Sequence, residues 1–512
     1  MEYTQTPYFK VGRASELEGN DRRLYRFLEM VPGILSWGTV VLIVLLSLFL
    51  PVWAAIFIIL FDLYWLFKTM YLSSHNLHNW KRLHANIKAD WKSMMVNLKY
   101  DDLYHLVLLP YYMEPKEVIE SGIQSLKEAR YDSKKILVVL ACEERAGSAA
   151  YESGLEIAKK YESEFGGFIV TQHPADVPGE MAGKGSNISF ACEEARKRLI
   201  DALTIPYEKV IVSAFDIDTV IYKDYFLCLT WYYLTTPNPE KASFQPVPLY
   251  NNNIWQAPML SRVVAFSNTF WQMIQQERPE KLVTFSSHSM SFKSLVEIGY
   301  WQKNMVSEDS RIFWNLYLAN NGNYRAIPIS YPVSMDANFA ETKLQTLKNI
   351  YKQQRRWMWG AENVPYLLMG CIKNKKIPFW KRARVIVVQL EGYWSAATNP
   401  IMILLLGWLP LILGGKLFRE TVLSYNLPLV TRNLMILSML GLISLAVMTF
   451  SFLPPIPKDI IVTQRKKFAM VVQWLLVPLT IVIFGSIPAL EAQTRLMIGK
   501  YMGYWVTPKH RE

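Results

Sequence analysis

The stretch Val210-Ile-Val-Ser-Ala-Phe-Asp-Ile-Asp-Thr219 joins a short apolar run to two carboxylates, Asp216 and Asp218. The apolar part predicts a buried β-strand. Because strand side chains alternate between faces, the two acids are expected to point the same way while Ile217 returns to the core. Carboxylates at the carboxyl end of a strand lie where α/β sheets bind ligands. The stretch therefore predicts a site for Mg²⁺ or Mn²⁺ holding a diphosphate, because Mg²⁺ usually takes one or two carboxylates plus substrate phosphates. The alternative is a strand that leads into a solvated acidic turn.

Segments around this strand alternate between strand and helix patterns. Strands are predicted at 103–109, 136–141 and 168–171, and helices at 117–130, 151–164 and 187–203. Such alternation predicts an α/β domain with a mainly parallel sheet and right-handed crossovers. Residues 68 to about 375 contain no stretch long enough to cross a bilayer, so we expect one soluble domain there.

Apolar segments flank the predicted domain. Residues 33–67 are apolar except for Asp62 and have Pro51 near the middle, which suits a hairpin of two spans at ~20 residues per crossing. One long tilted span is the alternative. Three later segments, 396–413, 434–453 and 468–490, also lack charges over spanning lengths. The number of spans is predicted only as four to six.

Basic residues stand beside the apolar segments. The net charge of +12 and the 13% aromatic residues therefore indicate a membrane surface rather than nucleic acid as the partner. A first basic cluster predicts an interfacial helix on an anionic cytoplasmic leaflet, and it consists of Lys373, Lys375, Lys376, Lys381, Arg382 and Arg384. A second cluster gives a positive-inside signal, and it consists of Lys458, Arg465, Lys466 and Lys467. The four scattered cysteines argue against a zinc module or a disulfide scaffold and fit a reducing compartment.

Polar groups follow other predicted strands at the same edge of the sheet. They are Glu114, the pair Glu143 and Glu144, and the loop Gly179-Glu-Met-Ala-Gly-Lys-Gly-Ser-Asn187. The glycines of this loop would allow close backbone approach to a ligand, and Lys184 would supply positive charge for a phosphate. The loop lacks Walker A spacing, and an ordinary turn before a helix is the alternative.

Two helix patterns carry further candidates. In Ser307-Glu-Asp309, an acid at a helix N-terminus is placed to act as a general base, although an ordinary helix start with Ser307 as N-cap is the alternative. In Gln353-Gln-Arg-Arg-Trp357, spacings of three and four put Gln353, Arg356 and Trp357 on one face of a helix. Such a face would suit a sugar, and a membrane-interface helix is the alternative.

Together these motifs resemble those of the membrane-bound family-2 glycosyltransferases of the cellulose synthase, hyaluronan synthase and β-mannan synthase type. The matching pieces are Pro-Tyr-Tyr-Met-Glu (110–114), Glu-Glu (143–144), Gly-Lys-Gly-Ser-Asn (183–187), Asp-Ile-Asp (216–218), Ser-Glu-Asp (307–309) and Gln-Gln-Arg-Arg-Trp (353–357). The resemblance covers about residues 100 to 370. It implies a Rossmann-like GT-A domain inserted between transmembrane helices, a divalent metal and inversion at the anomeric carbon.

The resemblance also implies a role for each candidate. Asp216 and Asp218 would bind Mg²⁺ or Mn²⁺, and Asp309 would be the catalytic base. Two sets of residues would contact substrates: Glu114, Glu143, Glu144, Lys184 and Asp216 the nucleotide-sugar donor, and Gln353, Arg356 and Trp357 the acceptor or diphosphate. The sequence departs from the family pattern at Met113, where Asn is usual, and at Glu143–Arg145, where Asp-Asp or Asp-x-Ser is usual.

The tail Tyr504-Trp-Val-Thr-Pro-Lys509 resembles the cytoplasmic gating loop of cellulose synthases, with Tyr in place of Phe. Three simple crossings after a cytoplasmic domain would leave this tail outside, so one apolar segment is expected to be interfacial or re-entrant. The expected organisation begins with a cytoplasmic segment (1–32), a transmembrane hairpin (33–72) and a cytoplasmic GT-A domain (73–372). An interfacial segment (373–392), transmembrane helices (393–492) and the tail (493–512) follow.

These observations predict a multi-pass enzyme of the cell membrane with a cytoplasmic catalytic domain. It would transfer a sugar from a nucleotide-diphosphate sugar to a growing polysaccharide or lipid-linked acceptor. A non-processive enzyme that moves one sugar to a lipid carrier is one alternative. A transporter or receptor with a nucleotide-binding domain is the other, although it predicts charges within the spans, and the three later apolar segments have none.

Overall fold

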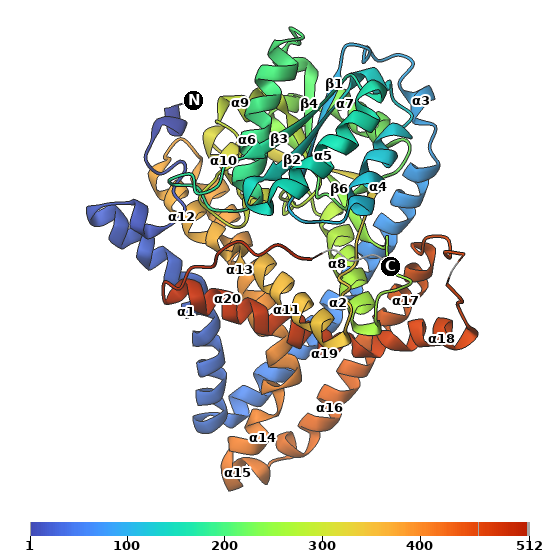
Figure 1. Ribbon diagram of the computed structural model, residues 1–512. Helices are drawn as coiled ribbons and strands as arrows, with labels where there is room; N and C mark the ends of the chain where they lie inside the picture. The colour runs from blue at the N-terminus through green and yellow to red at the C-terminus, as the bar shows by residue number, and fades with distance from the viewer. Residues whose placement is uncertain (1, 459, 509–512) are drawn as a thin grey trace.

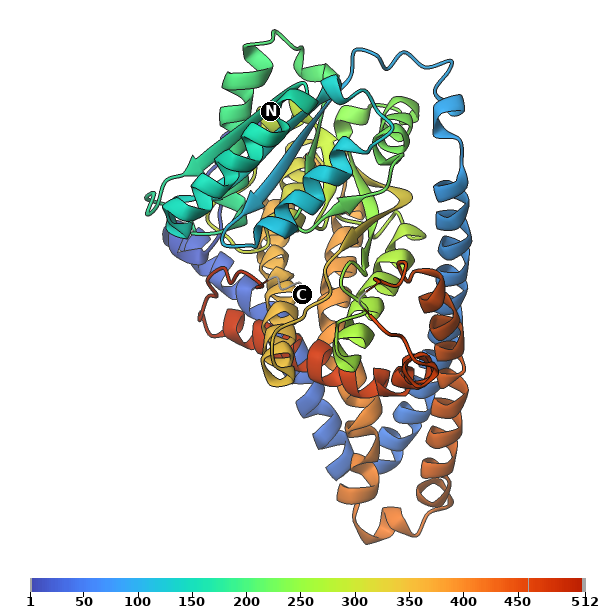
Figure 2. The same ribbon diagram turned by 45° about the vertical axis from the view of Figure 1, so that its right-hand side comes forward.

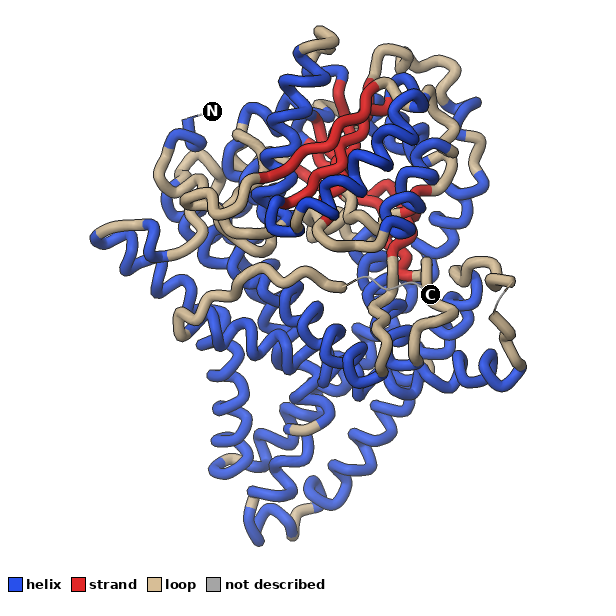
Figure 3. The backbone as a smooth tube through the Cα atoms, viewed as in Figure 1, coloured by secondary structure: helices blue, strands red, loops and turns tan. Residues whose placement is uncertain are grey.

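The computed structural model describes residues 2–458 and 460–508 and places an α/β domain above a group of long helices (Figure 1). All strands lie in the α/β domain, and the lower part is helical (Figure 3). One mixed sheet has the order β3-β2-β1-β4-β7-β6-β8-β5. Its strands are β1 Tyr104–Tyr111, β2 Ile136–Glu143, β3 Gly167–His173, β4 Val210–Ala214, β5 Val220–Ile221, β6 Ala242–Tyr250, β7 His288–Ser291 and β8 Arg325–Met335.

The first half of the sheet is parallel, as the sequence predicts. Strand β1 pairs in parallel with both β2 and β4, and β2 pairs in parallel with β3. The second half is mixed, because β7 runs antiparallel to both β4 and β6. The prediction of a mainly parallel sheet therefore holds for one half only. Strand β7 is four residues long and polar, His-Ser-Met-Ser, so it has no apolar periodicity to reveal it.

The sheet separates two hydrophobic cores. Along β1, Leu106 and Leu108 belong to one core, while Val107 and Leu109 belong to the other. This alternation follows from the two-residue period of a strand. The helices that cover the sheet and complete the domain are α3 Trp91–Met94, α4 Lys116–Lys127, α5 Ser148–Tyr161, α6 Lys184–Ala195, α7 Tyr225–Thr235, α8 Met259–Gln276, α9 Phe292–Glu297, α10 Glu308–Ala319, α11 Lys343–Met358 and α12 Asn363–Lys373.

Strand β4 ends earlier than the sequence predicts. It stops at Ala214, and the Thr219 amide donates to the Asp216 carbonyl at 2.9 Å, so a turn holds the two acids. Ile217 is buried as predicted. Asp216 and Asp218 nevertheless do not share a strand face: Asp216 is partly exposed, while Asp218 is fully buried. The prediction of two acids in strand alternation is wrong, because the turn replaces that alternation.

Among the residues that the structure describes, four segments are long and apolar enough to cross a membrane by length and composition, or up to five if a bent helix pair is one span. Helices α1 Gly19–Phe49 and α2 Pro51–Lys88 meet at Leu50, which gives a hairpin rather than one long helix. The bent pair consists of α13 Phe379–Leu404 and the segment Leu406–Leu413 with α14 Leu409–Leu413, which meet at 47°. The remaining helices are α15 Gly415–Arg419, α16 Val422–Met439, α17 Gly441–Ser451, α18 Gln464–Val472, α19 Val477–Ile481 and α20 Ile487–Met497.

Helices α18 to α20 run across the base of the α/β domain, transverse to the lower parts of α1, α2 and α16 (Figures 1 and 2). In α20, Gln493 donates from Nε2 to the Tyr393 carbonyl of α13 at 2.8 Å and accepts from Ser36 Oγ of α1 at 2.6 Å. The chain then returns to the α/β domain as the tail that begins after Met497. The tail and the sheet therefore lie on the same side of the lower helices.

The N-terminal segment also packs on the α/β domain. The buried guanidinium of Arg311 in α10 donates to the Val11 carbonyl at 3.0 Å, and Asn315 Nδ2 donates to the Phe9 carbonyl at 3.1 Å. Phe9 and Val11 belong to the core that contains α6 and α10. Part of the predicted N-terminal segment thus completes the domain core.

Candidate active site

Lys184 lies at the centre of the candidate site. Its ammonium donates to Asp216 Oδ1 at 2.6 Å and to Asp309 Oδ1 and Oδ2 at 3.0 and 2.9 Å. The lysine is only 6% exposed. Burial alone would lower the pKa of Lys184, but Asp216 and Asp309 raise it well above its ordinary value. A cation therefore joins the predicted metal-binding acid to the predicted base.

Two glycines beside Lys184 permit this arrangement. A Cβ atom at Gly183 would lie 2.6 Å from the Tyr504 ring, and one at Gly185 would lie 2.8 Å from the Gln302 carbonyl oxygen. Lys184 is the first residue of α6, and Gly185 lets the start of α6 approach Glu308 in α10. At both glycines it is another part of this chain that approaches closely, and their predicted role toward a ligand stays a prediction.

Asp309 occupies the first turn of α10, as predicted. Ser307 holds the N-cap position but makes no side-chain cap, because its hydroxyl donates to Glu362 Oε1 at 2.7 Å. The neighbouring Glu308 is buried, and both burial and Asp309 raise the pKa of its carboxyl. The helix start thus holds Asp309 at the site, next to a glutamate whose pKa is raised.

Sequence reasoning missed two residues next to Asp216 and Asp309, namely Ser286 and His288. Ser286 Oγ donates to Asp216 Oδ2 at 2.6 Å. His288 Nδ1 lies 2.7 Å from the Phe285 carbonyl and 3.9 Å from Asp309 Oδ1. Burial lowers the pKa of His288 despite the nearby acid. The run Ser286-Ser287-His288, where the loop enters β7, was the sequence signal for this loop.

Asp218 belongs to a second buried group. Its Oδ2 accepts from the Asp336 amide at 2.8 Å, and Asn252 Nδ2 donates both to the Asp218 carbonyl at 2.9 Å and to Asp336 Oδ1 at 3.0 Å. Asp336, at the end of β8, was also missed by sequence reasoning. The loop after β6 and the end of β8 therefore fix the turn that carries both predicted metal ligands.

The residues present fit a divalent ion whose coordination is completed by a substrate. Two oxygen-donor residues, Asp216 and Asp218, lie within one turn. Within residues 2–458 and 460–508, no three His, Cys, Asp or Glu side chains form a candidate metal cluster. Mg²⁺ needs no such cluster, since one or two carboxylates with substrate phosphates and water suffice.

Arg356 faces the charged group from α11. Its Nη1 donates to Tyr504 Oη at 3.2 Å, and its guanidinium carbon lies 5.0 Å from the centre of the Tyr504 ring. Burial would lower the pKa of Arg356, but Tyr504, Glu308 and the nearby aspartates raise it. The tail residue Tyr504 thus lies between the Gly183 loop and Arg356.

Gln353 and Trp357 both belong to α11 and line the same small hollow, as their spacing predicts. The other walls include Tyr250, Asn268 and Asp336. The ring centres of Tyr250 and Trp357 lie 5.9 Å apart with planes inclined by 38°. Tyr250 is a further residue that sequence reasoning missed, because it is the last residue of an apolar strand and has no motif. The hollow combines aromatic faces with amide groups, but its volume of about 10 Å³ has room for no more than a water molecule.

The three glutamates predicted for the nucleotide make local bonds. Glu114 Oε2 accepts from the Tyr112 amide at 2.6 Å, and Glu144 Oε2 accepts from the Ala175 amide at 2.7 Å. Glu143 is buried and pairs with Arg145. These contacts shape the loops at the ends of β1, β2 and β3. Their roles toward a nucleotide stay predictions.

Residues 211–485 match the sequence profile of a family described as glycosyl transferase family group 2. No curated protein matches the chain significantly. Among solved structures, the chain is similar to the mannosyltransferase PcManGT from Pyrobaculum calidifontis in complex with GDP-Man and Mn²⁺, at 15% identity over 77% of this chain and 99% of that one, with a TM-score of 0.42. It is also similar to residues 1–349 of S. aureus TarS in complex with UDP-GlcNAc, at 12% identity over 68% and 90% of the two chains, with a TM-score of 0.38.

Proposed function

Because this chain belongs to glycosyl transferase family group 2 and its α/β domain has the GT-A fold, we propose an inverting, metal-dependent transfer of a sugar at a membrane. The donor would be a nucleotide-diphosphate sugar, and the acceptor a growing polysaccharide or a lipid-linked sugar. The family match supports an enzyme over a transporter or receptor with a nucleotide-binding domain. The observation that carries the proposal is the contact of one lysine with both Asp216 and Asp309.

On the donor side, Asp216 and Asp218 would hold Mg²⁺ or Mn²⁺ against the diphosphate. The bound ion would supply positive charge that stabilises the leaving nucleotide diphosphate. Lys184 would add to that charge and would keep Asp216 ionised and oriented. Glu114, Glu143 and Glu144 would border the nucleoside.

On the acceptor side, Asp309 would accept the proton of the attacking hydroxyl. The acceptor sugar would pack on the open face of Trp357 and bond to Gln353, beside the small hollow that these two residues line with Tyr250. Arg356 would bind the diphosphate or the acceptor from the opposite side of the tail. Its guanidinium offers several fixed donors, which suits either group.

For the membrane, we propose four crossing segments: α1, α2, α13 with α14, and α16 with α17. An even number leaves the N-terminus, the α/β domain and the tail on one side, which we assign to the cytoplasm of the cell membrane from the basic clusters. Helices α18 to α20 would then lie along the membrane boundary. Their transverse direction supports this arrangement (Figure 2).

The test is a screen of nucleotide sugars with the full-length protein in detergent. Release of nucleoside diphosphate is measured with and without Mn²⁺, and product length on gels separates processive from single transfer. The proposal expects release from at least one donor and its loss in Asp309→Asn. A protein that stays folded and binds a donor but never releases nucleoside diphosphate would contradict it.

A further inference from the structure

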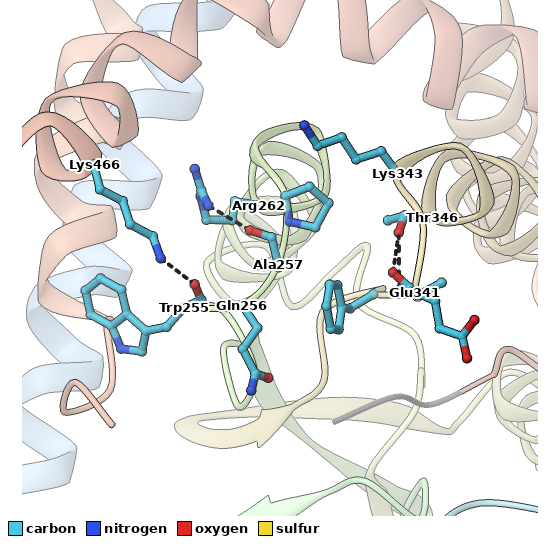
Figure 4. A pocket seen from close by; sticks show the side chains of 11 residues that line it. Trp255, Gln256, Ala257, Arg262, Glu341, Lys343, Thr346 and Lys466 are labelled. Atoms are coloured by element: carbon cyan, nitrogen blue, oxygen red, sulfur yellow. Dashed lines mark hydrogen bonds between the residues drawn. The ribbon is translucent and has the colours of Figure 1, made fainter. Parts of the chain in front are cut away.

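A separate cavity of about 360 Å³ lies between the α/β domain and the apolar helices (Figure 4). It is lined by the loop before α8, the segment before α11 and one residue of α18. Its charged residues are Arg262, Lys343 and Lys466, against one acid, Glu341. None of these four belongs to the candidate active site.

Arg262 is the most informative of these residues. It is 7% exposed and donates from Nε to Gln473 Oε1 at 3.0 Å and from Nη1 to the Ala257 carbonyl at 2.7 Å. Both partners are neutral, and burial lowers the pKa of Arg262 without an opposing acid. A buried guanidinium bonded only to neutral groups at a cavity wall is costly unless an anion completes it.

Lys466 approaches the cavity from α18. Its ammonium donates to the Trp255 carbonyl at 2.8 Å, again a neutral acceptor (Figure 4). Lys466 lies at the start of the apolar segment Gln464–Met497, and Trp255 donates from Nε1 to the Pro454 carbonyl at 3.0 Å. The cavity therefore lies where the domain meets the apolar helices.

Three helices begin at the cavity. Arg262 is in the first turn of α8, whose N-cap Pro258 gives no side-chain cap. Lys343 is the first residue of α11, and Lys466 is the third residue of α18. Helix N-termini carry partial positive charge, and Thr342 and Thr463 each cap one amide of α11 and α18. Their charge adds to that of the three basic side chains.

We propose that this cavity binds a phosphate group, carried by an anionic lipid or by a soluble phosphate ester. Arg262 and Lys466 would be its main ligands, and Lys343 would close the open side. The cavity adjoins the Trp357 hollow, because neighbouring residues line the two spaces. Arg262 and Phe339 line the cavity, and the residues just before them, Ser261 and Asn338, line the hollow. A bound phosphate would thus hold the segment from β8 to α11 in place.

The test uses the full-length protein in nanodiscs. Lipid retention is measured by native mass spectrometry in phosphatidylglycerol and in phosphatidylcholine, and thermal shift is measured with inorganic phosphate. Lys466→Gln should weaken binding roughly tenfold, as expected for loss of one charge-assisted bond. The matched control is Lys467→Gln, the adjacent exposed lysine that does not line the cavity. Glu341→Gln should strengthen binding.

The two sources give different results. If phosphatidylglycerol is retained and inorganic phosphate has no effect, the ligand is a lipid headgroup. If inorganic phosphate stabilises the parent but not Lys466→Gln, it is a soluble phosphate. Arg262→Gln should abolish binding. If Arg262→Gln does not fold, Lys466→Gln still tests the proposal. Equal binding by the parent, Lys466→Gln and Lys467→Gln would overturn the proposal.

Discussion

The two sides of the candidate site are built from different interactions. On the lysine side, Lys184 is buried and joins Asp216 and Asp309 through contacts of 2.6 to 3.0 Å. On the tryptophan side, Trp357 and Tyr250 line a hollow with tilted rings 5.9 Å apart. Charge governs the first side and contact area the second. Changes on the lysine side should therefore reduce donor cleavage and elongation together, whereas changes on the tryptophan side should reduce elongation alone.

Removal of divalent cations should have the largest effect on the lysine side. Chelation is expected to stop both donor hydrolysis and elongation, because the divalent ion would supply the positive charge that the leaving diphosphate needs. Nucleoside diphosphate release before and after addition of Mn²⁺ measures this. Asp218→Ala should lose the response to Mn²⁺. Asp218→Asn is the structural control for this variant, because its side-chain oxygen can still accept from the Asp336 amide. Full activity in chelator would refute the metal site.

Asp309→Asn should come next. Turnover is expected to fall ~10²–10⁴-fold, the usual loss for a positioned base, while donor binding stays close to that of the parent. Single-turnover kinetics and donor binding by calorimetry separate the two quantities. Asp101→Asn, an exposed aspartate outside the site, is the matched control. Turnover like the parent's would remove Asp309 from the mechanism.

Arg356→Lys tests the border between the two sides. A planar fork becomes a point charge, so one charge-assisted bond is lost, which is roughly a ten- to hundredfold effect. If Arg356 holds the acceptor, elongation should fall more than hydrolysis. Equal losses would assign Arg356 to the diphosphate, and hence to the lysine side.

Trp357→Phe should have a smaller effect. Loss of the indole face removes about 0.5–1.5 kcal/mol of aromatic contact, or about two- to tenfold in elongation, while donor hydrolysis stays unchanged. Product length and nucleoside diphosphate release are measured on the same sample. Trp380→Phe, at an exposed tryptophan outside the site, serves as the control. If both activities of Trp357→Phe equal those of the parent, only a membrane-interface role is left.

The smallest effect concerns Glu308 and appears in stability. The folded protein holds Glu308 protonated above the ordinary Glu pKa of about 4.3, whereas the unfolded chain releases the proton. Glu308 therefore lowers the free energy of unfolding increasingly as pH rises above that value, up to its raised folded pKa. Glu308→Gln removes this penalty, so its melting temperature should gain about 2–4 °C on the parent between pH 5 and pH 8. A difference that is constant with pH would contradict a raised pKa.

The sequence predicted which residues belong to the candidate site, but not which of them contact one another. Lys184, Asp216 and Asp309 each stand in a short motif, and the α/β alternation places them at one edge of the sheet. Their mutual contact depends on loops 32 to 125 residues apart in sequence, which no local pattern encodes. Ser286 and Tyr250 were missed for the same reason. The turn after Ala214 was missed because Ile217 is apolar and continues the strand pattern.

The helices show the same limit. The hairpin at Leu50 was predictable, because Pro51 interrupts an apolar segment. The direction of α18 to α20 was not, because length and composition cannot distinguish a crossing helix from one along the boundary. Only the predicted tail position required an even number of crossings. With the transverse helices along the membrane boundary, as we propose, the tail stays on the side of the α/β domain (Figure 1).

The anchoring of Tyr501 has a consequence for ligand affinity. Its hydroxyl lies 2.9 and 2.8 Å from the two carboxylate oxygens of Glu29 in α1, and Tyr504 follows three residues later. Three residues reach at most about 10 Å, so the Tyr504 ring stays near Gly183 and Arg356 even when it is displaced. Such a short tether gives the ring an effective concentration of millimolar order or above. A ligand that took the place of the Tyr504 ring would therefore compete with a group of this chain, and diluting the enzyme would not weaken that competition.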